Sequence, residues 1–78
     1  MRRTRHEISR DILNIALVEA KPTEIVYKGN LNFKIVQRHL ERLIDKNLLE
    51  ITRHGDKRTY LTTIEGKQYL NQLNAILY

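Results

Sequence analysis

The chain has 78 residues, of which 41% are hydrophobic and 29% charged, so it is long enough for one small globular domain and too short for two. It has no cysteine, which excludes disulfides and thiolate chemistry, and no apolar stretch long enough to span a bilayer. The net charge of +5 favours a polyanionic partner. We therefore expect a single cytoplasmic domain over residues 1–78.

A first helix is predicted after a short basic segment. Thr4-Arg5-His6-Glu7 has the S/T-x-x-E form of a capping box, and apolar residues then recur at helical spacing for several turns. We expect this helix to continue until Pro22 and Thr23, which end it and cap the next one. Residues 1–4 are predicted to form a flexible basic arm.

The next segment has the pattern of a helix-turn-helix. A short helix over 24–28 is followed by Gly29-Asn30, two residues that tolerate the left-handed backbone of a helix C-terminus. Asn32 is a favourable N-cap for a longer helix that we expect to run to Lys46. A short helix, a three-residue turn containing glycine and a longer helix together make this motif.

The longer helix is predicted to be amphipathic. His39 borders its apolar stripe and is expected to be partly buried. On the opposite face cations recur one turn apart, and Glu41 and Asp45 are placed to neutralise the later ones in part. The cationic column consists of Lys34, Arg38 and Arg42, and the apolar stripe consists of Phe33, Val36, Leu40, Leu43 and Ile44.

A β-hairpin and a last helix complete the chain. Two β-prone runs, 51–53 and 58–61, flank His54-Gly55-Asp56-Lys57, in which Gly-Asp is typical of a turn. Thr62 or Thr63 is expected to cap a final helix that reaches the last residue. The predicted inner stripe of that helix consists of Gly66, Tyr69, Leu70, Leu73, Ile76 and Leu77.

The predicted order is therefore helix, helix, helix, strand, strand, helix. This is the layout of an α+β, mostly α, winged helix-turn-helix domain, in which the hairpin packs beside the third helix. Basic residues gather in segments 1–11, 28–46 and 51–58, while the remainder is near neutral. This distribution favours nucleic acid as the partner, with a basic protein of scattered, solvated lysines as the alternative.

Residues 20–34, AKPTEIVYKGNLNFK, resemble the helix-turn-helix of small archaeal winged-helix transcription regulators, plasmid- and virus-encoded ones included. The likeness continues through 40–50 and through Tyr60 with the later Thr63-x-x-Gly66. The resemblance implies double-stranded DNA as partner, usually a homodimer, and no cofactor. One departure is Thr62, where such domains usually have an apolar residue, so the register of the second strand stays open by one residue.

With this fold, the third helix is expected to enter the major groove and the hairpin to lie on the adjacent backbone or minor groove. Gln37 can pair with adenine and Arg38 with guanine. The alternative is a solvated basic surface. The predicted base-readout residues are Asn32, Lys34, Gln37 and Arg38; the predicted phosphate and wing contacts are Lys28, Arg42, Arg53, His54, Lys57 and Arg58; the arm contributes Arg2, Arg3 and Arg5.

Other functions are less well supported by the sequence. The histidines fall in three different elements, so no metal site is predicted, and the chain has neither a cysteine nucleophile nor a phosphate-binding glycine loop, so no enzyme is predicted. The main alternative is a winged-helix protein–protein interaction module, which the uncharged segment 68–78 keeps open. The candidate homodimer interface, with a monomer as the alternative, consists of Leu13, Leu17, Leu73 and Leu77.

Overall fold

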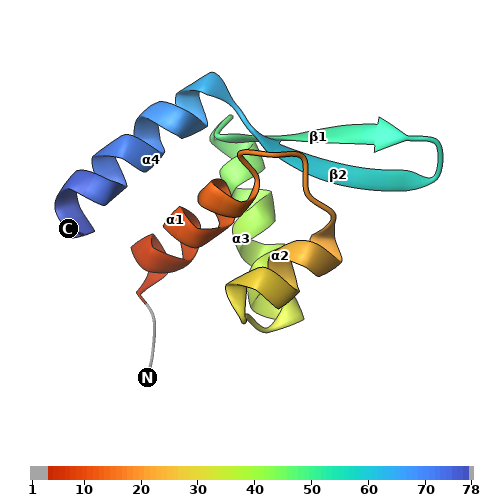
Figure 1. The fold of residues 1–78 in the computed structure, drawn as a ribbon, viewed down its shortest axis with the longest axis horizontal. Coiled ribbons are helices and arrows are strands. Elements are labelled where there is room, and N and C mark those ends of the chain that lie inside the picture. Colours follow the sequence, from red (N-terminus) through yellow and green to blue (C-terminus); the bar gives the residue numbers. More distant parts are fainter. Residues whose placement is uncertain (1–3, 78) are drawn as a thin grey trace.

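The computed structural model describes the backbone of residues 4–77 and the side chains of residues 4–76. Within this range four helices and one antiparallel hairpin follow each other in the order expected from the sequence (Figure 1). The arrangement is the α+β, mostly α, winged helix-turn-helix fold. The elements are α1 (Arg5–Ile15), α2 (Pro22–Gly29), α3 (Phe33–Asp45), β1 (Leu49–His54), β2 (Lys57–Thr62) and α4 (Ile64–Leu77).

Helix α1 begins with the expected capping box and ends earlier than expected. The Thr4 hydroxyl accepts a hydrogen bond from the Glu7 N–H at 3.1 Å, and the Glu7 carboxylate accepts one from the Thr4 N–H at 3.4 Å. The helix ends at Ile15 instead of continuing to Pro22, so that prediction was wrong. Residues 16–20 leave the helix because strand β2 takes up their backbone groups.

Segment 16–20 is joined to β2 by an isolated β-bridge, Ala20 to Tyr60, and by one further backbone hydrogen bond. Ala20 and Tyr60 exchange two backbone hydrogen bonds, of 3.0 and 2.8 Å, and the Thr62 N–H donates to the Ala16 carbonyl at 2.9 Å. A two-stranded hairpin alone is barely stable in water. The extra pairing fixes the hairpin, called the wing below, to the helices.

Helices α2 and α3 both end at an asparagine with left-handed backbone. Asn30 has φ 51° and Asn47 has φ 60°. In each case the N–H of the next residue, Leu31 or Leu48, donates to a carbonyl five residues earlier. This closes α2 at the predicted turn, although α2 starts two residues before its predicted first residue, after Lys21 instead of at a Thr23 cap.

The wing has a two-residue turn, Gly55-Asp56, with Gly55 at φ 63°. Figure 1 shows the wing extending to one side of the helices, with this turn at its far end. Tyr60 and Thr62 both face the core, which settles the register that the sequence left open. Thr62 replaces the usual apolar residue because its hydroxyl donates to the Leu13 carbonyl at 2.6 Å.

Helix α4 starts where the chain leaves the wing. The Thr63 hydroxyl caps it by accepting a hydrogen bond from the Gly66 N–H at 2.9 Å, as one of the two predicted caps. Its inner stripe packs against α1, but Ile76 is 77% exposed, so its predicted burial was wrong. The side chain of Leu77 lies outside the described residues. No helix within residues 4–77 is both long and apolar enough to cross a membrane.

Candidate nucleic-acid interface

The outward face of α3 carries all four residues predicted to read bases. Asn32 caps the helix, with its side-chain oxygen accepting from the Lys34 N–H at 2.8 Å. Lys34 and Arg38 stand one turn apart, and Gln37 lies beside Arg38. All four side chains are exposed, whereas Val36, His39, Leu40 and Leu43 on the opposite face are buried. The arrangement leaves their donors and acceptors available to a partner.

In the described part of the chain, the cations of α3 form no direct ion pair with the acids of the same helix. Among the described residues, Lys34, Arg38 and Arg42 form no ion pair, and Glu41 and Asp45 form none with them. The expected partial neutralisation of Arg38 and Arg42 by Glu41 and Asp45 therefore does not take the form of direct ion pairs. Arg42 is half-buried, and Lys34 and Arg38 are exposed. Cations that repel each other along a helix cost it stability, and a polyanion would remove that cost.

The wing places further cations close together. Arg53 lies directly opposite Arg58 in the ladder, and His54 lies opposite Lys57. Like charges in directly opposed positions destabilise a sheet. Lys57 and Arg58 also line a shallow groove with Pro22 and Thr23 at the start of α2. The turn of the wing and the first turn of α2 therefore border one basic surface.

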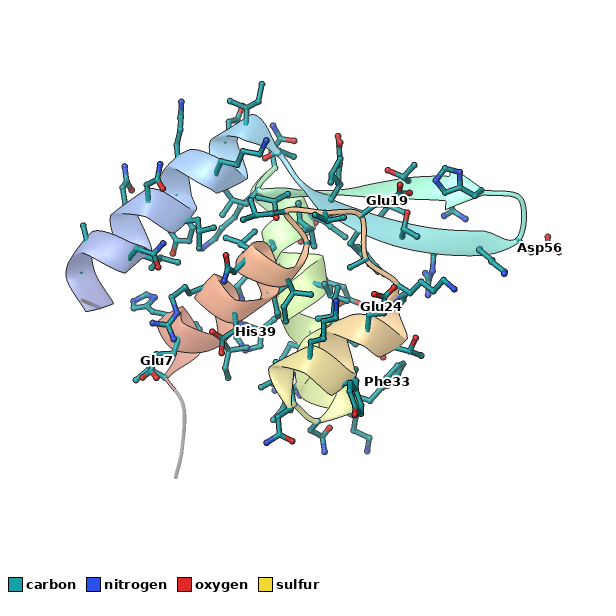
Figure 2. All side chains as sticks on the ribbon, in the orientation of Figure 1. Glu7, Glu19, Glu24, Phe33, His39 and Asp56 are labelled. Atoms are coloured by element: carbon teal, nitrogen blue, oxygen red, sulfur yellow. The ribbon has the colours of Figure 1, made fainter. Side chains whose placement is uncertain are left out.

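His54 has a protein partner that the sequence did not predict. Its Nε2 lies 2.5 Å from a Glu19 carboxylate oxygen, and the Thr59 hydroxyl donates to the same oxygen. These two hydrogen bonds, first from Thr59 and then from His54, lower the pKa of Glu19 below its ordinary value. Glu19 was missed because its segment was predicted to be helical, and no local pattern indicated that it would join the wing (Figure 2).

Lys28, another predicted phosphate contact, pairs with Glu24 on its own helix. Its Nζ lies 3.8 Å from the carboxylate, and both side chains are well exposed. An exposed pair one helical turn apart contributes only a few tenths of a kcal/mol. Lys28 is therefore weakly held and can exchange this carboxylate for another anion.

His39 is buried beneath the cations of α3, as its place in the sequence predicted. It is 9% exposed, and among the described residues its Nδ1 has no hydrogen-bond partner. Burial lowers the pKa of His39, and Arg42, Arg5 and Arg38 lower it further by repulsion. Arg5, the first residue of α1, thus lies near the cations of α3 and extends the basic surface (Figure 2 labels His39 beside α1). Arg2 and Arg3 lie outside the described residues.

Two aromatic side chains of the helix-turn-helix are exposed. Phe33, the first residue of α3, is 54% exposed, and Tyr27 on α2 is 86% exposed. The sequence places Phe33 in the apolar stripe, with packing favoured over contact with a thymine methyl, but its exposure shows that the expected burial is wrong. Periodicity alone missed it, because the first residue of a helix has no preceding turn to cover it.

The leucines predicted to form a dimer interface fall in different environments. Leu13 is fully buried and Leu73 is 3% exposed, so both are used in the core of the chain itself. Leu17 is 38% exposed. Within the described residues no cluster of His, Asp or Glu side chains could hold a metal ion.

Comparison with known proteins identifies the family to which this chain belongs. A family model described as winged helix-turn-helix matches residues 2–77. No curated protein sequence matches the chain. Among solved structures the chain is similar to Sso10a-2, a DNA-binding protein from Sulfolobus solfataricus, with a TM-score of 0.91 and 25% identity over 96% of this chain and 79% of the other.

Two further structures share the fold at lower identity. F93 from STIV, a winged-helix DNA-binding protein, has a TM-score of 0.83 and 12% identity over 96% of this chain and 91% of the other. The transcriptional regulator BldR from Sulfolobus solfataricus has a TM-score of 0.82 and 16% identity over 91% of this chain and 54% of the other. The chain thus spans about half the length of BldR, and at these identities the likeness shows the fold alone.

Proposed function

This chain belongs to the winged helix-turn-helix family, and from that premise we propose that it is a sequence-specific, double-stranded-DNA-binding transcription regulator. The observation that carries the proposal is the exposed face of α3, whose cations have no ion-pair partner among the described residues. A helix of this kind fits the major groove, which is wide enough to admit one. The DNA-binding proteins to which the chain is similar support the same partner.

In this proposal the first two turns of α3 read bases. Gln37 pairs with adenine through its amide, and Arg38 pairs with guanine through two donors of its guanidinium. Asn32 and Lys34, at the start of the helix, complete the readout face. The acids Glu41 and Asp45 lie in the later half of α3, so in this proposal only the first two turns enter the groove.

In this proposal the wing and the start of α1 contact the sugar–phosphate backbone of the DNA. Arg53, Lys57 and Arg58 contact the adjacent phosphates or minor groove, and this contact offsets the repulsion between the opposed arginines. Lys28 and Arg42 contact phosphates from the two sides of the readout face. The basic arm, Arg2 and Arg3, and Arg5 at the first position of α1 add contacts that do not depend on sequence. The protein acts without a cofactor and is not an enzyme.

A second candidate function is a protein–protein interaction module. One observation favours it: the outer face of α4 is exposed and uncharged at Gln68, Asn71, Gln72, Ala75 and Ile76. We propose that this face joins two copies in a homodimer, in place of the buried Leu13 and Leu73. A two-fold dimer would present two α3 helices about 34 Å apart on one side of a duplex.

The test of the proposed function is a fluorescence-anisotropy titration with random-sequence duplex DNA at several salt concentrations. The logarithm of the affinity should fall linearly with the logarithm of the salt concentration. Lys57→Ala should weaken binding to all duplexes alike and reduce the slope by about one. Lys67→Ala, which removes an exposed lysine of α4 outside the proposed interface, is the matched control and should bind like the unmodified protein.

Sequence readout is tested by the same titration on a selected site. Arg38→Ala should weaken binding to that site by about 1–3 kcal/mol and relax the preference at one base pair. If Arg38→Ala and Lys57→Ala cause equal losses on every sequence, Arg38 does not read a base. If no duplex binds even at low salt, the DNA-binding proposal fails, and the α4 face becomes the surface to study.

A further inference from the structure

An exposed aromatic side chain stands at the point where α3 begins. Phe33 is 54% exposed although it is among the most apolar residues of the chain. Figure 2 shows it at the outer edge of the molecule, beside the turn that joins α2 to α3. The helix does not need it as a cap, because Asn32 fills that position. The exposed ring is therefore available to a partner outside the chain.

Phe33 shares its side of α3 with a residue proposed to read bases. Gln37 lies four positions later, one turn along the same side of the helix. Lys34 and Arg38 form the neighbouring row, and all of these side chains are exposed. In a helix-turn-helix the first residues of the second helix contact the base edges. In the proposed complex with DNA, Phe33 would therefore lie on the part of α3 nearest the bases.

The major groove has one apolar group to offer such a side chain. Each thymine presents its C5 methyl there, next to the adenine N6 and N7 atoms of its pair or of a neighbouring pair. We propose that Phe33 contacts the methyl of a thymine while Gln37 pairs with a nearby adenine. This inference rests on the proposed function and adds a base preference to it, because α3 then selects a site containing adjacent A·T pairs. The contact would stabilise the complex because it removes the methyl group and the face of the Phe33 ring from water.

The test compares thymine with deoxyuridine, which pairs identically and lacks only the C5 methyl. A preferred duplex is first selected from a random library with the unmodified protein. Each thymine of that duplex is then replaced singly, and affinities are measured by anisotropy. At one position per binding site the replacement should weaken binding about fourfold, which corresponds to about 0.8 kcal/mol for burying one methyl-sized group.

Variants at Phe33 identify the side chain that senses the methyl. Phe33→Ala should bind the thymine duplex more weakly and should lose the difference between thymine and deoxyuridine at that position. Phe33→Leu keeps a smaller apolar contact and should give an intermediate ratio. Ile64→Ala is the matched control, since Ile64 is 75% exposed but lies at the start of α4, and it should keep the full ratio. Circular dichroism of each variant verifies that the helices are retained.

The outcomes separate this inference from the proposed function. If the unmodified protein selects a defined duplex but no thymine responds, or if Phe33→Ala keeps the same ratio, the methyl contact is wrong while sequence-specific binding stands. If the protein selects no sequence, the proposed base readout and this inference both fail.

Discussion

His39 has an environment that disfavours its charged form. It is 9% exposed, its Nδ1 has no partner among the described residues, and its pKa is lowered first by burial and then by Arg42, Arg5 and Arg38. In the unfolded chain the imidazole is hydrated and titrates near 6.5. Between the two pKa values the unfolded state therefore binds more protons than the folded state, and stability rises with pH across that window.

We expect an NMR titration to place the His39 pKa below 6.5 in the free protein. On binding duplex DNA this pKa should rise, because phosphates offset the positive charge of Arg42, Arg5 and Arg38. In urea unfolding, the free protein should lose stability as the pH falls from 6.5 through the folded-state pKa of His39. His39→Leu should reduce this dependence, and a titration at or above 6.5 in the free protein would contradict the account.

Individual side chains differ in how far the sequence could predict them. The exposure of Lys34, Gln37 and Arg38 followed from helical periodicity, because residues three and four positions apart share a face. The contact of Glu19 with His54 joins residues far apart in the chain and has no local pattern. Phe33 fitted the apolar period, but its position at the helix start left it uncovered.

At the scale of elements, Gly66 lies where the wing joins α4, and it has less room for a side chain than Gly29 or Gly55. A Cβ added to Gly66 would lie 2.0 Å from the Leu48 carbonyl oxygen and 2.7 Å from a Thr62 methyl carbon. The carbonyl cannot move freely, because it also accepts the Thr63 N–H at 3.1 Å. Gly66 therefore lets the first turn of α4 pass directly over the end of α3 and the start of β1.

Gly66→Ala should accordingly destabilise the protein by about 1–3 kcal/mol, although alanine is the better helix former by up to about 1 kcal/mol. The displaced turn of α4 would have to separate from the Leu48 carbonyl. Urea unfolding monitored by circular dichroism measures the change. Gln68→Ala, at an exposed position two residues later, is the control and should be near neutral. Equal stability of both variants would show that the junction yields easily.

The elements themselves were largely predictable, and their ends less so. The capping box of α1, the Asn32 cap and the Gly29-Asn30 turn after α2 are short-range patterns, and the structure confirms them. The end of α1 depends on β2, which lies far along the chain and captures residues 16–20. A helix end set by a distant strand cannot be read from local propensity.

On the scale of the whole molecule, basic and uncharged surfaces lie on different elements. The cations occupy α3, the wing and the start of α1, whereas the outer face of α4 from Gln68 to Ile76 has no charge. This separation permits one molecule to bind a polyanion and a second copy at the same time. The proposed homodimer therefore does not compete with DNA for surface.

Sedimentation equilibrium should show a dimer whose fraction grows with protein concentration. Ile76→Glu should shift it towards the monomer, because a charge without a partner in the contact is costly to desolvate. The control is Ile64→Glu, since Ile64 is 75% exposed and Ile76 is 77% exposed on the same helix. A monomer mass at every concentration, or equal effects of both variants, would rule out this interface.

The pairing of segment 16–20 with β2 also affects the order in which parts of the structure can form during synthesis. Ala20 leaves the ribosome forty residues before Tyr60, its partner in the bridge. Until then the Ala16 carbonyl and the backbone N–H and carbonyl of Ala20 lack the partners that β2 supplies, and the hairpin is marginal by itself. The arrival of β2 therefore fixes the end of α1 and the wing in one step, so the proposed DNA-binding surface forms only after β2 has been made.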